Sequence, residues 1–277
     1  MRVDIGGGVR LFIDIDGLKW VFDGPELVER PTVLLLHGGP GLDHAAFKVG
    51  PLAGLSDIAQ VVYYDHRGNG RSDGDDPTAW NLDTWADDVV RLCEALGIER
   101  PIVFGGSFGG MVAQRYLALH PEHPAKVILG YTTARQAVDE KVEAFTKLGG
   151  PEVGEVARRF WELEEGSVEP YRQICAPFYS TRPADPRLVG RALKTDVMRH
   201  FQRGEEHDMD LRPGLAAARC PVLVLGGELD PVCPVAMSRE IAAALPPSLV
   251  ELHIVPGASH RDVTIAAIDV IRAFVAS

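Results

Sequence analysis

A serine flanked on both sides by glycine pairs is the strongest chemical feature of this sequence. The segment Gly105–Gly110 (Gly-Gly-Ser-Phe-Gly-Gly) follows a short apolar run, 102–104, and precedes a helical pattern over 111–119. A G-x-S-x-G segment between a strand and a helix is typical of a nucleophile elbow, in which small residues two before and two after the serine allow a very sharp turn. The amino end of the following helix directs backbone donors toward a developing oxyanion. The pattern therefore predicts that Ser107 is a nucleophile in acyl transfer.

A serine hydroxyl becomes an effective nucleophile only when a base accepts its proton. In chains with such an elbow, the acid and then the histidine follow the serine in sequence. His260 comes after a short loop at the end of a predicted strand, Val250–Val255, and loops at that edge of a sheet carry working residues. We therefore expect His260 to be the base. His253, inside the same predicted strand, stays open as the alternative.

The carboxylate that orients the imidazole is expected on the loop after the apolar run Val222–Leu225. Glu228 and Asp230 both lie there, and Asp230 stands directly before Pro231, where the chain turns. Such a carboxylate holds the histidine tautomer and stabilises the imidazolium that forms during reaction. Asp230 is the predicted acid, and Glu228 remains a weaker alternative.

Two further loops follow predicted strands. The turn His37–Gly41 (His-Gly-Gly-Pro-Gly) lacks side-chain bulk, as a loop that offers a backbone N–H to an oxyanion must. We expect the N–H groups of Gly39 and Phe108 to form the oxyanion hole, with His37 orienting the loop. The segment Asp65–Ser72 favours a structural turn pinned by Asp and Arg hydrogen bonds.

These loops require a sheet whose strands end along one edge. Short β-branched runs alternate with helical segments such as Leu82–Leu96, which indicates an α/β fold with a mostly parallel central sheet flanked by helices. The first strands lack an intervening helix, so we expect an antiparallel edge hairpin, with Asp16-Gly17 as its turn. The alternation stops between about 131 and 212. We predict a core of residues 1–131 and 213–277 and a helical cap inserted at 132–212. The predicted strands are Val9–Ile15, Thr32–Leu36, Gln60–Tyr64, Pro101–Phe104, Lys126–Leu129, Val222–Leu225 and Val250–Val255.

Composition excludes several other classes of function. The 277 residues carry a formal net charge of −11, which disfavours nucleic acid and anionic membranes as partners. The four cysteines have no close pair of the kind found in zinc or redox motifs, so we expect neither a metal nor an organic cofactor. We find no apolar stretch of the roughly 18 residues needed to span a bilayer and no signal-peptide pattern at the first residues, so we expect a cytoplasmic protein. The oligomeric state stays open.

The motifs at 37–41, 65–72 and 105–110 together resemble those of the proline iminopeptidase branch of the α/β-hydrolase superfamily. The resemblance implies an α/β-hydrolase fold with a catalytic triad of Ser107, Asp230 and His260. Those peptidases usually have Trp where this chain has Phe108. They also hold the substrate amine with acidic cap residues in a Glu-Asn-His-Tyr-Phe stretch, whose nearest counterparts here include Glu205 and Glu206.

The expected function is hydrolysis of a small ester or amide through an acyl-enzyme intermediate. The resemblance implies an aminopeptidase that releases N-terminal proline from short peptides, with Glu205 or Glu206 binding the amine. The alternative is a carboxylesterase or lactonase for uncharged acyl substrates, under an aromatic roof that includes Phe145, Trp161 and Phe178. A more remote alternative is a non-catalytic protein that binds small ligands with the same fold.

Overall fold

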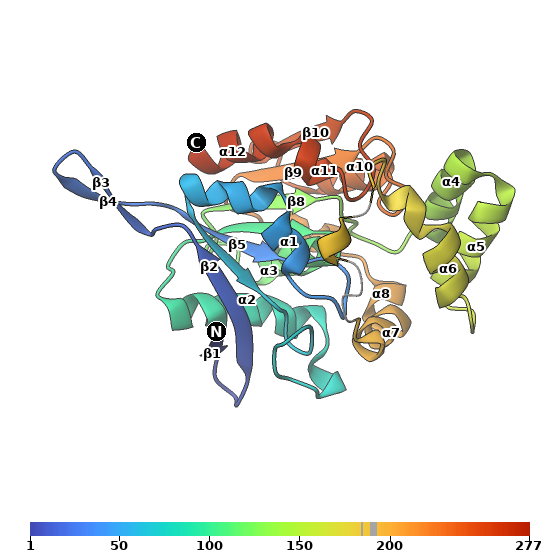
Figure 1. The fold of residues 1–277 in the computed structure, drawn as a ribbon, viewed down its shortest axis with the longest axis horizontal. Helices are drawn as coiled ribbons and strands as arrows, with labels where there is room; N and C mark the ends of the chain where they lie inside the picture. The colour runs from blue at the N-terminus through green and yellow to red at the C-terminus, as the bar shows by residue number, and fades with distance from the viewer. Residues whose placement is uncertain (184, 189–192) are drawn as a thin grey trace.

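The computed structural model describes residues 1–183, 185–188 and 193–277. Within these residues an eight-stranded sheet has the order β1-β2-β6-β5-β7-β8-β9-β10, and every neighbouring pair from β6 to β10 is parallel (Figure 1). The predicted mostly parallel sheet is therefore confirmed. The strands are β1 (Arg2–Asp4), β2 (Arg10–Asp16), β3 (Trp20–Asp23), β4 (Glu26–Glu29), β5 (Thr32–Leu36), β6 (Gln60–Tyr64), β7 (Ile102–Gly106), β8 (Lys126–Gly130), β9 (Val222–Gly227) and β10 (Val250–Val255).

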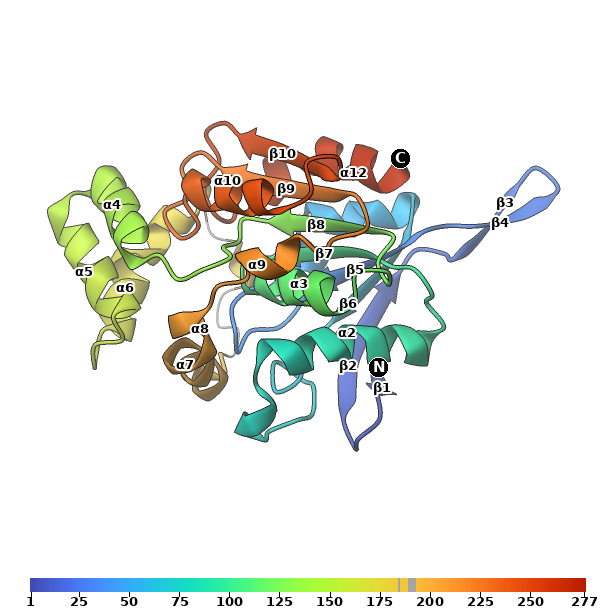
Figure 2. The same cartoon turned by 180° about the vertical axis from the view of Figure 1, so that it is seen from behind.

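Helices cover both faces of the sheet (Figures 1 and 2). One apolar core joins the sheet to α2, α3, α9 and α10, and a second joins its other face to α1, η1, α11 and α12. The α-helices are α1 (Ala45–Val49), α2 (Leu82–Leu96), α3 (Phe108–Leu119), α4 (Val138–Gly149), α5 (Pro151–Trp161), α6 (Val168–Ile174), α7 (Thr195–Arg203), α8 (Glu205–Asp208), α9 (Arg212–Leu215), α10 (Val235–Ala244), α11 (Val263–Ala266) and α12 (Ile268–Ala276). The 3₁₀ helices are η1 (Pro51–Asp57), η2 (Pro77–Ala79), η3 (Ala176–Tyr179) and η4 (Pro186–Leu188).

The central strands are buried on both faces, which explains their continuous apolar runs. All residues of β5, β7 and β9 are buried, as expected for parallel strands that carry helices on each side. Helix α2 has the predicted bounds, because the Asn81 side chain accepts a hydrogen bond from the Thr84 N–H at its start and Gly97 takes a left-handed conformation (φ 64°) at its end. The strong periodicity and the caps agree, so this element could be predicted closely.

The predicted turn of the edge hairpin is wrong. An antiparallel hairpin does form the sheet edge, but β1 and β2 form it, and the chain between them carries three glycines at positive φ, Gly6, Gly7 and Gly8. Beyond Gly17 the chain instead leaves the sheet as a separate hairpin, β3 and β4, and returns as β5 on the far side of β6. The sequence prediction overlooked this second, exposed hairpin, whose strands are only four residues long.

The segment between β8 and β9 is helical where the structure describes it. Helices α4, α5 and α6 form a lobe at one end of the molecule, while α7 and α8 lie close to the sheet domain (Figure 1). The two ends of the segment meet, since the Leu211 N–H donates to the Ala134 oxygen (2.7 Å) and Arg135 forms a β-bridge with Asp210. A third apolar cluster joins the lobe to Val232 and Cys233, in the loop after β9. None of the helices among the described residues has the length and apolar character needed to cross a membrane.

Candidate active site

Ser107 sits in a strained turn between β7 and α3. Its backbone has φ 55° and ψ −120°, in the left-handed half of conformational space that non-glycine residues rarely adopt. Space around the turn is minimal: a Cβ on Gly105 would collide with the Gly109 oxygen, and a Cβ on Gly109 would collide with the Leu36 oxygen. Helix α3 begins at Phe108, three residues earlier than the sequence pattern predicts, so the serine lies directly at its amino end.

The structure brings His260 and Asp230 to this serine. His260 Nε2 lies 3.0 Å from Ser107 Oγ, and His260 Nδ1 lies 2.8 Å from Asp230 Oδ2. A carboxylate can only accept, so Nδ1 carries the proton of a neutral imidazole and Nε2 accepts from the serine hydroxyl. The side chains of Asp230 and His260 are 0% and 7% exposed. This is the arrangement in which a serine can pass its proton to a base.

The loop after β9 fixes the carboxylate. Asp230 Oδ1 accepts from the N–H groups of Val232 (2.8 Å) and Cys233 (2.9 Å), which leaves Oδ2 for the histidine. The two alternatives from sequence lie elsewhere. Glu228 is exposed and accepts from the Gly257 N–H (2.8 Å), and His253 is half-buried on the edge strand β10. Neither makes a recorded contact with Ser107.

The His37–Gly41 turn approaches the serine closely. A Cβ on Gly38 would lie 3.0 Å from the Ser107 Cβ. The His66 N–H donates to His37 Nε2 (3.1 Å), so Nδ1 carries the hydrogen and donates to the Gly38 oxygen (3.1 Å). Burial lowers the pKa of His37 to about 4, which keeps this ring neutral.

The hydrogen bond from His37 to the Gly38 oxygen also orients the Gly39 N–H. In a planar trans peptide the C=O of Gly38 and the N–H of Gly39 point in opposite directions, so fixing one fixes the other. Within the described residues, neither the Gly39 N–H nor the Phe108 N–H donates to another protein group. Both are free to stabilise an oxyanion near Ser107, which is the role that the sequence predicts for them.

The segment 65–72 braces this turn. Asp65 is fully buried and accepts from the His44 N–H (3.0 Å) and from the Arg71 N–H and Nε (2.9 and 3.0 Å). Although burial alone would raise it, these hydrogen bonds and that from the His44 ring hold the pKa of Asp65 well below its usual range. Asn69 Oδ1 accepts from the Gly41 N–H (2.5 Å). The contacts fit the structural role expected from sequence.

Aromatic rings surround the reacting groups. The buried Phe108 ring packs edge-on against His66, Trp85 and Phe201, with centroids 5.0 to 5.5 Å away, so it links the elbow to α2 and α7. Tyr131 and Tyr179 flank His260 at centroid distances of 5.0 and 5.3 Å. Sequence reasoning missed both tyrosines. Tyr131 directly follows β8, so its place at a strand's carboxyl end was an available signal, whereas Tyr179 lies in the helical insertion without a motif.

The two predicted aromatic substrate residues lie in the third apolar cluster. Trp161 ends α5 and packs against Phe160 and Tyr171. Phe178 is half-buried in η3, and its oxygen accepts from the Ser259 hydroxyl (2.6 Å) beside His260. Phe178 is thus placed near the histidine loop, whereas Trp161 packs against other residues of the lobe.

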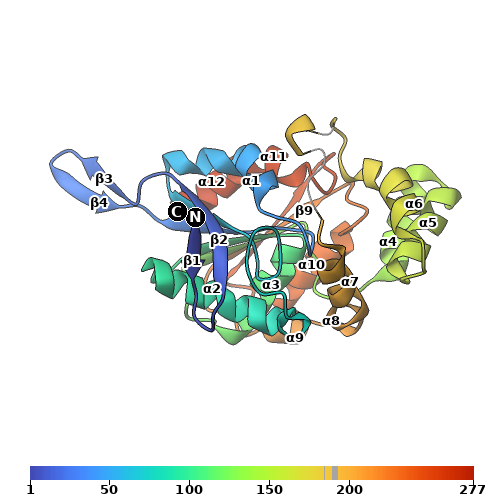
Figure 3. The ribbon, with the colours of Figure 1, turned by 60° about the horizontal axis from the view of Figure 1, so that its bottom comes forward.

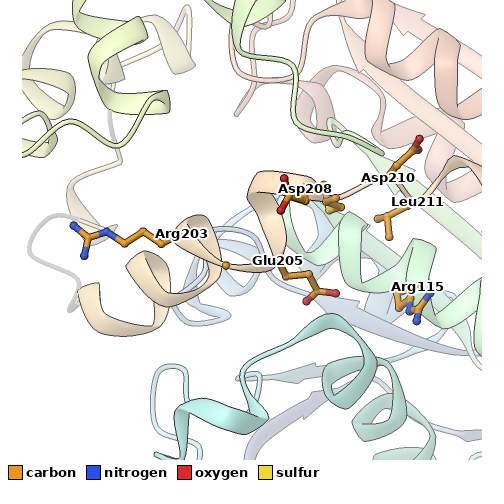
Figure 4. A pocket seen from close by; sticks show the side chains of 8 residues that line it. Arg115, Arg203, Glu205, Asp208, Asp210 and Leu211 are labelled. Carbon is orange, nitrogen blue, oxygen red and sulfur yellow. The ribbon is translucent and has the colours of Figure 1, made fainter.

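The two predicted acidic residues have different surroundings. Glu205 Oε2 accepts from the Leu82 N–H (2.7 Å) and so caps the amino end of α2. It borders an open depression together with Arg115, Arg203 and Leu211, whose lining includes neither Ser107 nor His260 (Figure 4). Glu206 is only 4% exposed and has no recorded hydrogen bond among the described residues. Burial raises the pKa of Glu206, which the charge of Lys141 partly opposes.

Lys141 is a charged residue of this region that the sequence prediction did not include. It is 1% exposed, donates to Gln136 Oε1 (2.7 Å) and places its ammonium 3.5 Å from the centre of the Trp161 ring. Burial lowers the pKa of Lys141, while Glu206 and, more weakly, Asp230 favour its charged form. A signal did exist, because Lys141 shares a helical stripe with the buried Phe145, one turn along α4.

Among the residues that the structure describes, one group could hold a metal ion. The ligand atoms of Asp230, Cys233 and His260 lie within 4.8 Å of one another. The carboxylate and the imidazole are already joined by a hydrogen bond, and burial raises the pKa of the Cys233 thiol well above its ordinary value. The geometry therefore matches a hydrogen-bonded pair rather than a set of metal ligands.

Comparison with known proteins gives a consistent assignment. A family model described as alpha/beta hydrolase fold matches residues 31–263. A putative carbamate hydrolase, RutD, of Caulobacter sp. (strain K31) is 28% identical over 239 residues, 86% of this chain and 87% of that protein. A proline iminopeptidase of Lactobacillus delbrueckii subsp. bulgaricus is 37% identical over 113 residues, only 39% of this chain and 38% of that protein. The crystal structure of a proline iminopeptidase from Mycobacterium smegmatis superposes with a TM-score of 0.75 at 23% identity, covering 100% of this chain and 96% of the other.

Proposed function

The chain belongs to the alpha/beta hydrolase fold family, and from that premise we propose that it hydrolyses a small ester or amide through a covalent acyl-enzyme. The observation that carries the proposal is the continuous chain of hydrogen bonds from Ser107 Oγ through His260 to Asp230, with links of 3.0 and 2.8 Å. These three groups come from three separate loops, so their alignment is a property of the fold. Two of the similar proteins are named as a putative carbamate hydrolase and a proline iminopeptidase, and both names support the same reaction class.

In the proposed mechanism Ser107 Oγ attacks the substrate carbonyl while His260 Nε2 takes its proton. Asp230 stabilises the imidazolium through the Nδ1 hydrogen bond. The N–H groups of Gly39 and Phe108 donate to the tetrahedral oxyanion. His260 then protonates the leaving group. In the second half-reaction it removes a proton from the water that attacks the acyl-enzyme, and it passes that proton to Ser107 Oγ as the acid departs.

We further propose that the helical segment 132–212 covers the site and selects the substrate. A free substrate amine would need a carboxylate with no cation of its own. Glu205 is occupied as a helix cap, and Glu206 shares its buried surroundings with the ammonium of Lys141. A substrate ammonium beside Glu206 would therefore be repelled whenever the Lys141 amine carries its proton. Uncharged esters, lactones or amides fit these surroundings better than peptides with a free amino terminus.

Proline iminopeptidase activity is the second candidate. Its support is that Glu206 is a buried carboxylate with no recorded hydrogen bond among the described residues, as a residue that receives an amine would be. It requires that the substrate amine compete successfully with Lys141. A non-catalytic binding role has less support, because Ser107, His260 and Asp230 are joined by the hydrogen bonds that acyl transfer uses.

A paired assay separates these candidates. Purified protein and the Ser107→Ala variant are given a short-chain p-nitrophenyl ester and an N-terminal prolyl arylamide. We expect turnover of the ester, lost in Ser107→Ala, with little turnover of the prolyl arylamide. Efficient release of proline would favour the peptidase. Saturable binding of both compounds without turnover of either would refute the hydrolase proposal.

A further inference from the structure

A two-stranded hairpin projects from the molecule at the end opposite the α4–α6 lobe (Figures 1 and 3). Its strands, β3 and β4, pair only with each other and form a sheet of their own. A single two-stranded hairpin is marginally stable in water and normally gains stability from further strands or from packing. The base of the β3–β4 hairpin is tied to the sheet domain by the hydrogen bond from Lys19 Nζ to the Gly97 oxygen (3.1 Å), but no further strand of the described residues pairs with it.

One face of the hairpin carries three large, exposed apolar side chains beside Glu29, which lies opposite Trp20. Trp20 and Phe22 alternate along β3, and Leu27 lies directly across from Phe22, so the three side chains share a face. They are 50%, 79% and 56% exposed, respectively. Large apolar side chains gathered on a projecting element mark an interaction surface. The protein as a whole has a formal net charge of −11, so this exposed apolar cluster contrasts with its acidic character.

The outer edge of β3 carries unused backbone groups. The Arg30 N–H donates to the Lys19 oxygen (2.7 Å), so Lys19 faces β4. Alternate residues of an antiparallel strand point their N–H and C=O groups the same way, so Val21 and Asp23 also face β4. The backbone groups of Trp20 and Phe22 therefore point outward, where another strand can bind them.

We propose that two copies of this chain associate through their β3 edges, forming a four-stranded antiparallel sheet about a two-fold axis at Val21. The outward backbone groups of Trp20 then exchange hydrogen bonds with those of Phe22 of the second copy. Those of Phe22 do the same with Trp20 of the second copy. In this register the rings of Trp20 and Phe22 pair across the junction. Lys19 lies opposite Asp23 of the second copy. Because the interface lies on a two-fold axis, each of these contacts occurs twice in the dimer.

The side-chain pairs favour this edge over the other edge of the hairpin. If β4 paired with itself about the matching two-fold axis, at Val28, Leu27 would lie opposite Glu29 of the second copy, an apolar residue against a charge. On β3 the same geometry gives an aromatic pair and an opposite-charge pair. Asp23 is also available, since no cation in the described part of the chain lies within ion-pair distance of it. Lys19 Nζ lies 3.2 Å from Glu29 Oε1 of its own chain and donates to the Gly97 oxygen (3.1 Å). In the dimer the Lys19 charge is therefore shared between Glu29 and Asp23 of the second copy.

A charge exchange tests both the association and its register. Sedimentation equilibrium of the wild-type protein over a concentration series should show a dimer of twice 30.1 kDa that dissociates on dilution. Lys19→Asp alone places two aspartates opposite each other at both ends of the junction, and Asp23→Lys alone places two lysines there. Each variant should raise the dimer dissociation constant by about tenfold. An equimolar mixture of the two variants should restore association, because every pair is then of opposite charge.

The controls make the result decisive. Leu252→Asp changes an exposed apolar residue on β10, the edge strand at the other side of the main sheet, and should leave the dimer intact. Turnover of the p-nitrophenyl ester by each variant serves as the check that the protein is folded. A wild-type protein that stays monomeric throughout the series would overturn the proposal. So would a mixture no tighter than its components, or a dimer that Leu252→Asp dissociates.

Discussion

Replacing Asp230 by Asn tests the proposed site most directly. Asparagine has nearly the same shape, and its carbonyl oxygen can still accept from the N–H groups of Val232 and Cys233, so the loop should keep its conformation. Its NH2 group then faces His260 Nδ1, where the carboxylate Oδ2 lies 2.8 Å away in the wild-type protein. That contact favours the tautomer with the proton on Nε2. An imidazole in this form donates to Ser107 and cannot accept its proton.

The expected loss can be estimated from the geometry. During attack the imidazolium is opposed by the Asp230 charge, with charge centres about 4 Å apart, which is worth about 4 kcal/mol at an effective dielectric constant of 20. Losing it corresponds to a factor of about 10³ in rate. The unfavourable tautomer adds to this, so we expect a total reduction of kcat by 10³ to about 10⁴, the scale seen for this substitution in other triads.

The assay compares kcat for the p-nitrophenyl ester in Asp230→Asn and in Glu228→Gln, with thermal unfolding as a check of the fold. Glu228 is exposed and bonds only to the Gly257 N–H, so Glu228→Gln should retain nearly full activity. A tenfold loss or less in Asp230→Asn would refute the assigned role of this carboxylate. A large loss in Glu228→Gln with an active Asp230→Asn would move the role to Glu228.

Ser107, His37 and Lys141 each have a property that a single substitution can test. Ser107→Gly should abolish turnover yet raise the free energy of unfolding in urea by roughly 1 kcal/mol, because glycine accepts the φ of 55° without strain; an unchanged or lower value would contradict the strain. The pKa of His37, lowered by burial to about 4, lies below the roughly 6.5 of an unfolded histidine, so the unfolded state binds more protons and stability falls as pH drops between these values. His37→Gln should therefore lose up to about 3 kcal/mol of that pH dependence in urea unfolding, and an unaltered slope would argue against a neutral buried ring. Lys141→Met should raise kcat/KM for the prolyl arylamide relative to the ester, since Glu206 then has no competing cation, and adding Glu206→Gln should reverse the change; equal ratios in all three proteins would remove Lys141 from substrate selection.

The sheet and the elements that carry the proposed triad could be predicted from sequence because each has a short-range signal. Gly105 and Gly109 must be glycine because a Cβ at either position would collide with the elbow itself or with the adjacent strand β5. The elbow can therefore be recognised as a sequence motif. Asp230 and His260 follow strands whose apolar runs mark their ends. For such residues the local pattern and the tertiary position coincide.

The environment of the cap could not be predicted in the same way. Glu205 and Glu206 are neighbours in sequence, yet one caps α2 and the other is buried near Lys141. Which of them turns inward depends on how α8 packs, and a run of acidic residues carries no information on that. The contact between Leu82 and Glu205 spans 123 residues, beyond the reach of any periodicity.

The meeting of the two ends of the helical insertion has a consequence for how this protein can change over generations. Because Ala134 and Leu211 are hydrogen-bonded neighbours, the chain between them can be lengthened, shortened or exchanged while both strands that flank it stay in place. Changes within the segment can then alter the proposed substrate selection while Ser107, Asp230 and His260 stay on the core. The freedom is incomplete, since the lobe also packs on Val232 and Cys233, whose amides hold Asp230. A new insertion must also replace the contacts that Phe201 makes with Phe108, Glu205 with Leu82 and Phe178 with Ser259.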